Sequence, residues 1–208
     1  MYEYHGSNAQ SEIKSLQERL YDDACRTRGA SVQERLVSEQ ESLVQWAEQH
    51  GRLIAEDACR LWLGGIQEIA CGQEHAVYLD RSVSRVIKVT IHGSYGLSGY
   101  AYRYLEYLYL SNELFGDDIR LGGILPSYDE LNEEPYAAIV TSQPFIAGER
   151  PTEEEITAWF AQYGYALESR HTYVNHAERV RVSDAHTGNL IRVEDQQLVP
   201  IDVLPERF

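Results

Sequence analysis

The segment Asp-Ala-His-Thr-Gly-Asn at residues 184–189, followed by Val-Pro-Ile-Asp at residues 199–202, decides how we interpret this sequence. Phosphoryl transfer requires a carboxylate that orients the attacking hydroxyl and oxygen ligands that hold Mg²⁺ against the phosphates. Asp184 meets the first requirement, and Asn189 and Asp202 meet the second. A hairpin after Asn189 would return Asp202 beside it, since a strand of four or five residues spans about 15 Å. Taken alone, the pattern is also typical of an ordinary loop.

Lys88 is the second candidate, in the segment Val-Ile-Lys-Val at residues 86–89. Apolar neighbours on both sides predict a strand, in which alternate side chains share a face. A lysine on such a strand is most often solvated on the open face of a sheet. Here a glycine turn, Gly-Gln-Glu-His beginning at Gly72, lies one strand earlier. A lysine facing a glycine turn holds nucleotide phosphates, so we assign Gly72 and Lys88 to nucleotide binding.

Glu106 lies on the helix predicted after Lys88, at residues 99–115. An ion pair from this helix would hold the lysine ammonium toward the phosphates. Glu113, two helical turns later, is the alternative partner.

The segment Val-Thr-Ser-Gln-Pro at residues 140–144 leaves the last strand of the same region. Extended backbone offers N–H and C=O groups to an adenine edge, and Pro144 lacks the N–H. Ser142 and Gln143 are therefore the adenine-binding candidates, with an ordinary interdomain linker as the alternative.

The remaining pattern predicts helices, three strands, a helix, two strands, a linker, a helix, a loop and a final hairpin. Capping boxes at Ser31–Glu34 and Thr152–Glu155 begin two of the helices, and Gly51 ends the first of these. The strands are expected at residues 66–70, 76–79, 85–90, 119–125, 136–142, 190–193 and 198–201, with the last turn at residues 194–196. We divide the chain into a helical extension (1–63), a nucleotide-binding strand region (64–143) and a C-terminal region (144–208).

Composition excludes several classes of function. The net charge of −15 argues against a nucleic-acid partner and against docking on anionic membranes, but one nucleotide needs only local cations and a metal ion. The three cysteines form no C-x-x-C pair, which argues against a zinc site and predicts a reduced, cytoplasmic protein. No apolar run reaches the roughly 18 residues of a membrane span, and the N-terminus is too polar for a signal peptide.

In this order the pieces resemble the protein-kinase-like fold. More narrowly, residues 40–208 resemble the small kinase-like domains of phage and mobile-element polyvalent proteins, whereas the Asp-x-His-x-x-Asn form is similar to aminoglycoside and choline phosphotransferases. The segments that carry the narrower resemblance are residues 72–78, 86–90, 112–117, 142–145 and 201–203. The resemblance implies an α+β fold with a five-stranded antiparallel N-lobe containing one helix, and a much reduced C-lobe that ends in a hairpin. It also implies ATP and Mg²⁺ as cofactors.

The sequence departs from the family pattern at several places. One glycine stands where typical kinases have three, and Val182-Ser183 precede Asp184 where kinases have His-Arg. Glu74 and His75 have no counterpart in ordinary kinases; we place both with the cofactor-binding residues, although His75 either contacts a phosphate or caps the turn. Six residues follow Asp202, so we expect no activation segment or peptide-docking lobe.

Three hypotheses follow. The first is an ATP- and Mg²⁺-dependent phosphotransferase in a prokaryotic or phage-infected cytoplasm, with Asp184 orienting the hydroxyl of a protein, small-molecule or self acceptor. The second is a non-catalytic nucleotide-binding module whose N-terminal helices bind a partner or a second copy. The third is a metal-dependent hydrolase that uses His186 with Asp184 and Asp202.

Overall fold

The computed structural model describes residues 9–91, 93, 95, 99–129, 134–194 and 196–208. The chain divides into two compact units. Unit 1 comprises Met1–Glu106 and Asp118–Phe145, and unit 2 comprises Tyr107–Asp117 and Ile146–Phe208. Each unit is described by itself below.

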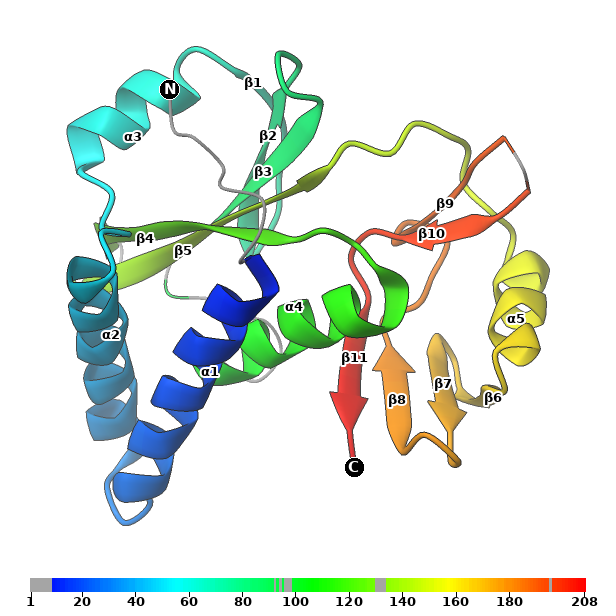
Figure 1. Ribbon diagram of the computed structural model, residues 1–208, viewed down its shortest axis with the longest axis horizontal. Helices are drawn as coiled ribbons and strands as arrows, with labels where there is room; N and C mark the ends of the chain where they lie inside the picture. Colours follow the sequence, from blue (N-terminus) through cyan, green and yellow to red (C-terminus); the bar gives the residue numbers. More distant parts are fainter. Residues whose placement is uncertain (1–8, 92, 94, 96–98, 130–133, 195) are drawn as a thin grey trace. The chain divides into compact units, whose positions relative to one another are not determined.

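Unit 1 contains a five-stranded antiparallel sheet in the order β1-β2-β3-β5-β4 (Figure 1). Its strands are β1 (Gln67–Cys71), β2 (His75–Asp80), β3 (Arg85–Thr90), β4 (Arg120–Asp129) and β5 (Glu134–Pro144). Five antiparallel strands were predicted, and all five are found. β4 and β5 are longer than predicted because their outer ends pair with each other, from Leu125↔Ala138 to Asp129↔Glu134.

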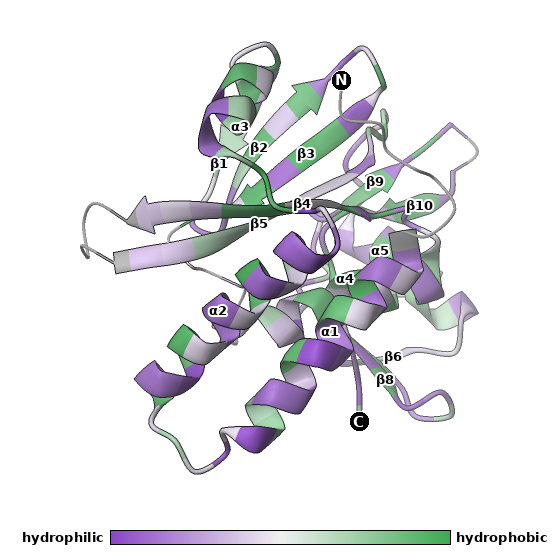
Figure 2. Cartoon of the chain, turned by 60° about the vertical axis from the view of Figure 1, so that its left-hand side comes forward, coloured by the Kyte–Doolittle hydropathy of each residue, from purple (hydrophilic) through white to green (hydrophobic). Residues whose placement is uncertain are grey.

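The described part of unit 1 contains three helices and the start of a fourth. They are α1 (Ala9–Arg26), α2 (Val32–Gln49), α3 (Glu56–Leu63) and the start of α4 (Ala101–Phe115). Of these, α2 begins and ends at the predicted signals. Both halves of the Ser31–Glu34 capping box are formed, and Gly51, just after α2, takes a left-handed φ of 64°. α1 and α2 pack side by side, and hydrophobic and hydrophilic residues alternate along both (Figures 1 and 2). The apolar stripe of α1, formed by Ile13, Leu16 and Leu20, is fully buried.

Unit 2 contains α5 (Glu153–Gln162), whose Thr152–Glu155 capping box is formed as predicted. The predicted final hairpin is also present as β9 (Leu190–Arg192) and β10 (Leu198–Pro200). Its turn, predicted at residues 194–196, includes residue 195, which lies outside the described residues.

Two predictions for unit 2 were wrong. The segment after α5 was expected to be a loop, and the hairpin was expected to be the last element. A second antiparallel sheet occupies both places, in the order β11-β8-β7-β6. Its strands are β6 (Ala166–Ser169), β7 (Thr172–Asn175), β8 (Val180–Ser183) and β11 (Leu204–Arg207). Each has only four residues, and β6 is exposed along its whole length, so no alternation of polar and apolar residues marks it.

The core of unit 2 explains why these short strands are stable. Val180 and Val182 of β8 are fully buried, and they pack with Ile156 and Phe160 of α5. The ring of Phe160 stacks on Tyr173 of β7 with 4.2 Å between centroids. The small sheet therefore has one apolar face covered by α5, and β8 leads directly into the segment that begins at Asp184.

Candidate active site

The loop at residues 184–189 follows β8 and is closed by hydrogen bonds of its own backbone. Asp184 has a left-handed φ of 56°, which turns the chain sharply out of the sheet. The carbonyl of Asp184 accepts from His186 N at 3.0 Å, and the carbonyl of His186 accepts from Asn189 N at 2.9 Å. Ala185, between them, is fully buried, and its N–H donates to His171 O at 3.0 Å. The loop is thus tied to the sheet, while the Asp184 side chain remains about half exposed.

Asn189 holds Asp184 from the other end of the loop. Its Nδ2 donates to the carboxylate Oδ2 of Asp184 at 2.8 Å and to the main-chain oxygen of Asp184 at 2.9 Å. Two donors of one amide thus fix both the backbone and the carboxylate of Asp184, and the amide oxygen of Asn189 is left to act as an acceptor or a metal ligand.

His186 contacts the second oxygen of the same carboxylate. Gly188 N–H donates to His186 Nδ1 at 2.9 Å, so Nδ1 is an acceptor and the neutral ring carries its proton on Nε2. Nε2 lies 3.6 Å from Asp184 Oδ1. On its other side the His186 ring lies 5.5 Å, between centroids, from His171, whose Nε2 is 3.3 Å from Glu153 Oε1. His186 therefore presents an N–H toward the candidate base.

The β9–β10 hairpin returns the chain to Asn189, as predicted. Leu190 pairs with Pro200 across the hairpin, and Ile201 N donates to Asn189 O at 2.9 Å. Asp202 is the next residue after Ile201. The backbone register therefore brings the Asp202 position to Asn189, within unit 2 alone.

Lys88 lies in the interior of the unit 1 sheet. Its Cα pairs with Val77 of β2 on one side and with Thr141 of β5 on the other. The turn between β1 and β2 is tight, since Gly72 N donates to His75 O at 2.9 Å. The glycine turn, β2 and the strand that carries Lys88 therefore follow one another in the predicted order, with β2 between the turn and the lysine strand.

His75 has a partner that neither sequence alternative included. Its Nε2 lies 3.0 Å from the hydroxyl of Tyr104 on α4, and the two rings are 5.5 Å apart. The carbonyl of Glu74 accepts from Ile91 N at 3.0 Å, which joins the turn to the end of β3. The roles of Glu74 and His75 in nucleotide binding stay predictions.

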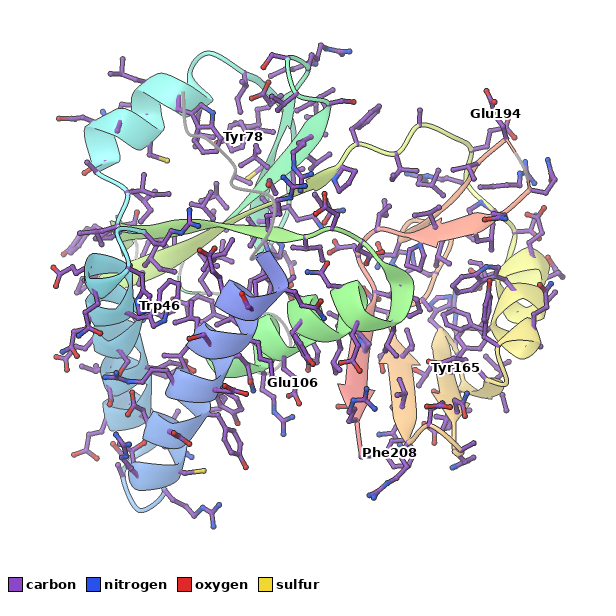
Figure 3. The ribbon with its side chains drawn as sticks, viewed as in Figure 1. Trp46, Tyr78, Glu106, Tyr165, Glu194 and Phe208 are labelled. Atoms are coloured by element: carbon purple, nitrogen blue, oxygen red, sulfur yellow. The ribbon has the colours of Figure 1, made fainter. Side chains whose placement is uncertain are left out.

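Both glutamates proposed as partners of Lys88 form ion pairs elsewhere. Glu106, labelled on α4 in Figure 3, lies 2.8 Å from Arg103, one turn earlier on the same helix. Glu113 pairs with Arg207 of β11. The ion pair of Lys88 with Glu106 therefore stays a prediction.

Ser142 and Gln143 lie inside β5 rather than in a linker, opposite Ile87 and Val86 of β3. The hydroxyl of Ser142 accepts from Arg85 Nε at 3.1 Å, and its carbonyl accepts from Arg85 Nη2 at 3.0 Å. No local pattern in the sequence predicts this role of Arg85. Any adenine contact of Ser142 must therefore coexist with Arg85, and the assignment of both residues to adenine binding stays a prediction.

The donor set near Asn189 suits magnesium. Amide and carboxylate oxygens are the ligands that Mg²⁺ prefers, and Asn189 and Asp202 supply one of each. In the described part of the chain, no cluster of three or more His, Cys, Asp or Glu side chains suits a metal ion. Among the same residues, no helix has the length and apolar character needed to cross a membrane.

Comparison with known proteins identifies the family. The model of a family described as serine/threonine/tyrosine kinases found in polyvalent proteins matches residues 37–205. The chain belongs to this polyvalent-protein kinase family. No curated protein matches the chain. The matched range includes every candidate residue from Gly72 to Asp202 and excludes α1, so the predicted relation to polyvalent-protein kinases is confirmed, and the chain is a kinase-like phosphotransferase by family.

Proposed function

We propose that this polyvalent-protein kinase transfers the γ-phosphoryl group of ATP, with Mg²⁺, to a hydroxyl acceptor. The observation that carries the proposal is a pair of contacts made by Asn189. Its side-chain amide donates to the Asp184 carboxylate, and its main-chain carbonyl accepts from the N–H of Ile201, the residue before Asp202. One residue thereby connects a candidate base with a candidate metal ligand.

Each residue has a role that follows from its chemistry. The Asp184 carboxylate, held by Asn189 and facing His186, accepts a hydrogen bond from the acceptor hydroxyl and orients its oxygen for attack. Lys88 contributes positive charge to the triphosphate. Asn189 Oδ1 and the Asp202 carboxylate are the residues that would hold Mg²⁺, which when bound neutralises charge on the phosphates.

A second function is favoured by one observation. Glu106 and Glu113, the two candidate partners of Lys88, are both paired with arginines. A kinase-like module that binds nucleotide without turnover would be compatible with this pairing, with ATP acting as a ligand.

A thermal-shift titration separates the two functions. Wild-type protein, Lys88→Met and Asp202→Ala are melted with ATP and with a non-hydrolysable ATP analogue, each with and without Mg²⁺. The transferase predicts Mg²⁺-dependent stabilisation of the wild type by both nucleotides and loss of γ-phosphate from ATP. Stabilisation without γ-phosphate loss supports the binding module. No stabilisation by either nucleotide contradicts both functions.

A further inference from the structure

Glu39 is a glutamate of α2 that is only 7% exposed. A carboxylate is retained in such a place only when hydrogen bonds compensate for its lost hydration. Leu43 and Trp46, four and seven residues later, are also buried, so Glu39 occupies an apolar-stripe position of the helix. A glutamate at a position suited to leucine indicates a specific partner.

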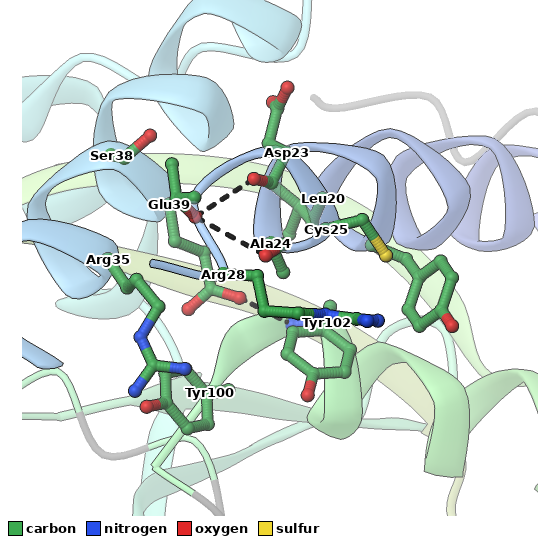
Figure 4. Close-up of a pocket in the computed structure, with 12 residues that line it drawn as sticks. Leu20, Asp23, Ala24, Cys25, Arg28, Arg35, Ser38, Glu39, Tyr100 and Tyr102 are labelled. Atoms are coloured by element: carbon green, nitrogen blue, oxygen red, sulfur yellow. Dashed lines mark hydrogen bonds between the residues drawn. The ribbon is translucent and has the colours of Figure 1, made fainter. Parts of the chain in front are cut away.

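The partner is the N-terminus of α4. Glu39 Oε1 accepts from Tyr102 N (Figure 4), and Oε2 accepts from Ala101 N, both at 2.9 Å. The N–H groups of the next two residues of α4 donate to the carbonyl of Tyr100, both at 3.2 Å. The first four N–H groups of a helix have no partner within the helix itself. Glu39 satisfies two of them in α4.

The residue before the first turn of α4 is not a typical helix cap. Tyr100 is none of Ser, Thr, Asp or Asn, which cap helix N-termini best, and the first turn contains no acidic residue. By contrast, α2 and α5 each have a local Ser or Thr cap. A carboxylate at a helix N-terminus is also favoured by the helix dipole. The start of α4 therefore depends on a residue 62 positions earlier in the chain.

The surroundings of Glu39 tie this cap to the N-terminal helices. Glu39 lines a cavity of about 170 Å³ with residues of α1, including Leu20 and Asp23. Asp23 accepts from Ser42 Oγ of α2 at 2.7 Å, which joins α1 to α2 one turn beyond Glu39. Burial raises the pKa of Glu39, although the two α4 N–H groups oppose this rise. The carboxyl is therefore held by the packing of α1, α2 and α4 together.

We propose that Glu39 is a positioning residue for phosphoryl transfer, an inference that rests on the proposed function. Glu106 lies four residues after Tyr102 on α4, about 6 Å along the helix axis and on the same face. By fixing the first turn of α4, Glu39 fixes the turn that carries Glu106. It thereby governs whether Glu106 can pair with Lys88.

A double-mutant cycle tests the proposal. Rates of γ-phosphate loss from ATP are measured at saturating ATP and Mg²⁺ for wild type, Glu39→Gln, Glu106→Gln and the double variant. Glu41→Gln, an exposed glutamate of the same helix, is the matched control. Glu39→Gln keeps the shape of the side chain but leaves one α4 N–H facing an amide N–H₂. We expect each single variant to lower kcat at least tenfold, the control to match wild type, and the double variant to be no slower than the slower single variant.

The outcomes separate the inference from the function. No γ-phosphate loss by the wild type overturns the proposed function, and this inference with it. If the wild type is active, two results overturn the role of Glu39 alone. Either Glu39→Gln keeps full kcat, or the losses of kcat in Glu39→Gln and Glu106→Gln multiply in the double variant. If Glu39→Gln does not fold, Glu39→Asp replaces it, because Asp keeps the negative charge on a side chain that is one methylene shorter. We then expect a smaller loss of kcat that does not multiply with the loss caused by Glu106→Gln. If the two losses do multiply, the inference is overturned.

Discussion

Asn189 Nδ2 and the Asp184 carboxylate are joined at 2.8 Å, and the same amide nitrogen reaches the Asp184 main-chain oxygen at 2.9 Å. The residue proposed to bind the metal therefore also fixes the residue proposed to orient the acceptor. Disturbing one should therefore disturb the other.

Replacing Asn189 by Ala removes both donors and the amide oxygen. We expect kcat to fall about 100-fold, the size of effect usual for a displaced catalytic carboxylate, and the Mg²⁺ concentration for half-maximal rate to rise. Steady-state rates over a Mg²⁺ titration measure both. Thr187→Ala, in the same loop, is the control and should change neither. An Asn189→Ala enzyme with an unaltered Mg²⁺ dependence would rule out Asn189 as a ligand.

His186→Phe removes the N–H that faces Asp184 Oδ1 and the ring nitrogen that accepts from Gly188 N. We expect a tenfold to roughly 100-fold lower kcat, because the carboxylate loses one of its two orienting neighbours, with little change in KM for ATP. Exposed His176, in the turn after β7, supplies the control variant His176→Phe. A proportional loss in both variants, or a loss expressed only in KM, would contradict a positioning role for His186.

The sequence allowed much of the fold around this candidate site to be predicted, since its signals are local. Alternation marked β3, Ser31 and Thr152 marked helix starts, and a short hairpin after Asn189 was sufficient to return Asp202. Each of these signals lies within a few residues of the feature it predicts.

What could not be predicted depends on partners far apart in the chain. Nothing near α4 indicates that Glu39 caps it, although a glutamate in register with Leu43 and Trp46 was a visible signal. The contact of His75 with Tyr104 likewise joins residues 29 positions apart. The small sheet of unit 2 was missed because its strands are too short for a periodic pattern to stand out.

Asp118 gives a pH-dependent prediction for stability. Its Oδ2 lies 2.8 Å from both Arg85 and Arg120, and Arg85 is only 8% exposed. Burial alone would raise the pKa of Asp118, but hydrogen bonds from Arg120 and Arg85 outweigh it and lower the pKa below its usual value. A lowered pKa means that the ionised carboxylate stabilises the fold above the unfolded-state pKa. This stabilisation is lost as pH falls through the folded-state pKa.

Asp118→Asn isolates this contribution, since Asn tolerates the left-handed φ of 48° at this position. Because the carboxylate is partly exposed and screened, we expect a loss of about 1–2 kcal/mol in the free energy of unfolding at pH 7. The loss should shrink between pH 4 and pH 3. Urea unfolding of wild type and variant at pH 7 and at pH 3 measures this difference, with Asp22→Asn, at an exposed position, as the control. A difference between wild type and variant that is as large at pH 3 as at pH 7 would show that the ion pair is not its source.

Gly123 tests the packing of the sheet in unit 1. Its φ is +153°, and a Cβ there would lie 2.4 Å from the carbonyl oxygen of Arg52 and 2.8 Å from Ile54. Gly123→Ala should therefore cost about 2–4 kcal/mol of unfolding free energy, from overpacking and backbone strain together. At Gly29 an added Cβ meets nothing within 4 Å, so Gly29→Ala should change stability by no more than about 0.5 kcal/mol. Equal stability of the two variants in denaturant would refute the close approach at Gly123.

Transfer of label from γ-labelled ATP measures whether Asp184 orients a hydroxyl for attack on ATP. Purified wild type and Asp184→Asn are incubated with γ-labelled ATP, Mg²⁺ and heat-treated cell lysate, and covalently bound label is counted in the lysate and in the chain itself. We expect Mg²⁺-dependent labelling by the wild type and a loss of at least 100-fold in Asp184→Asn. Equal labelling by the two proteins, or none by the wild type while it still binds ATP, would contradict it.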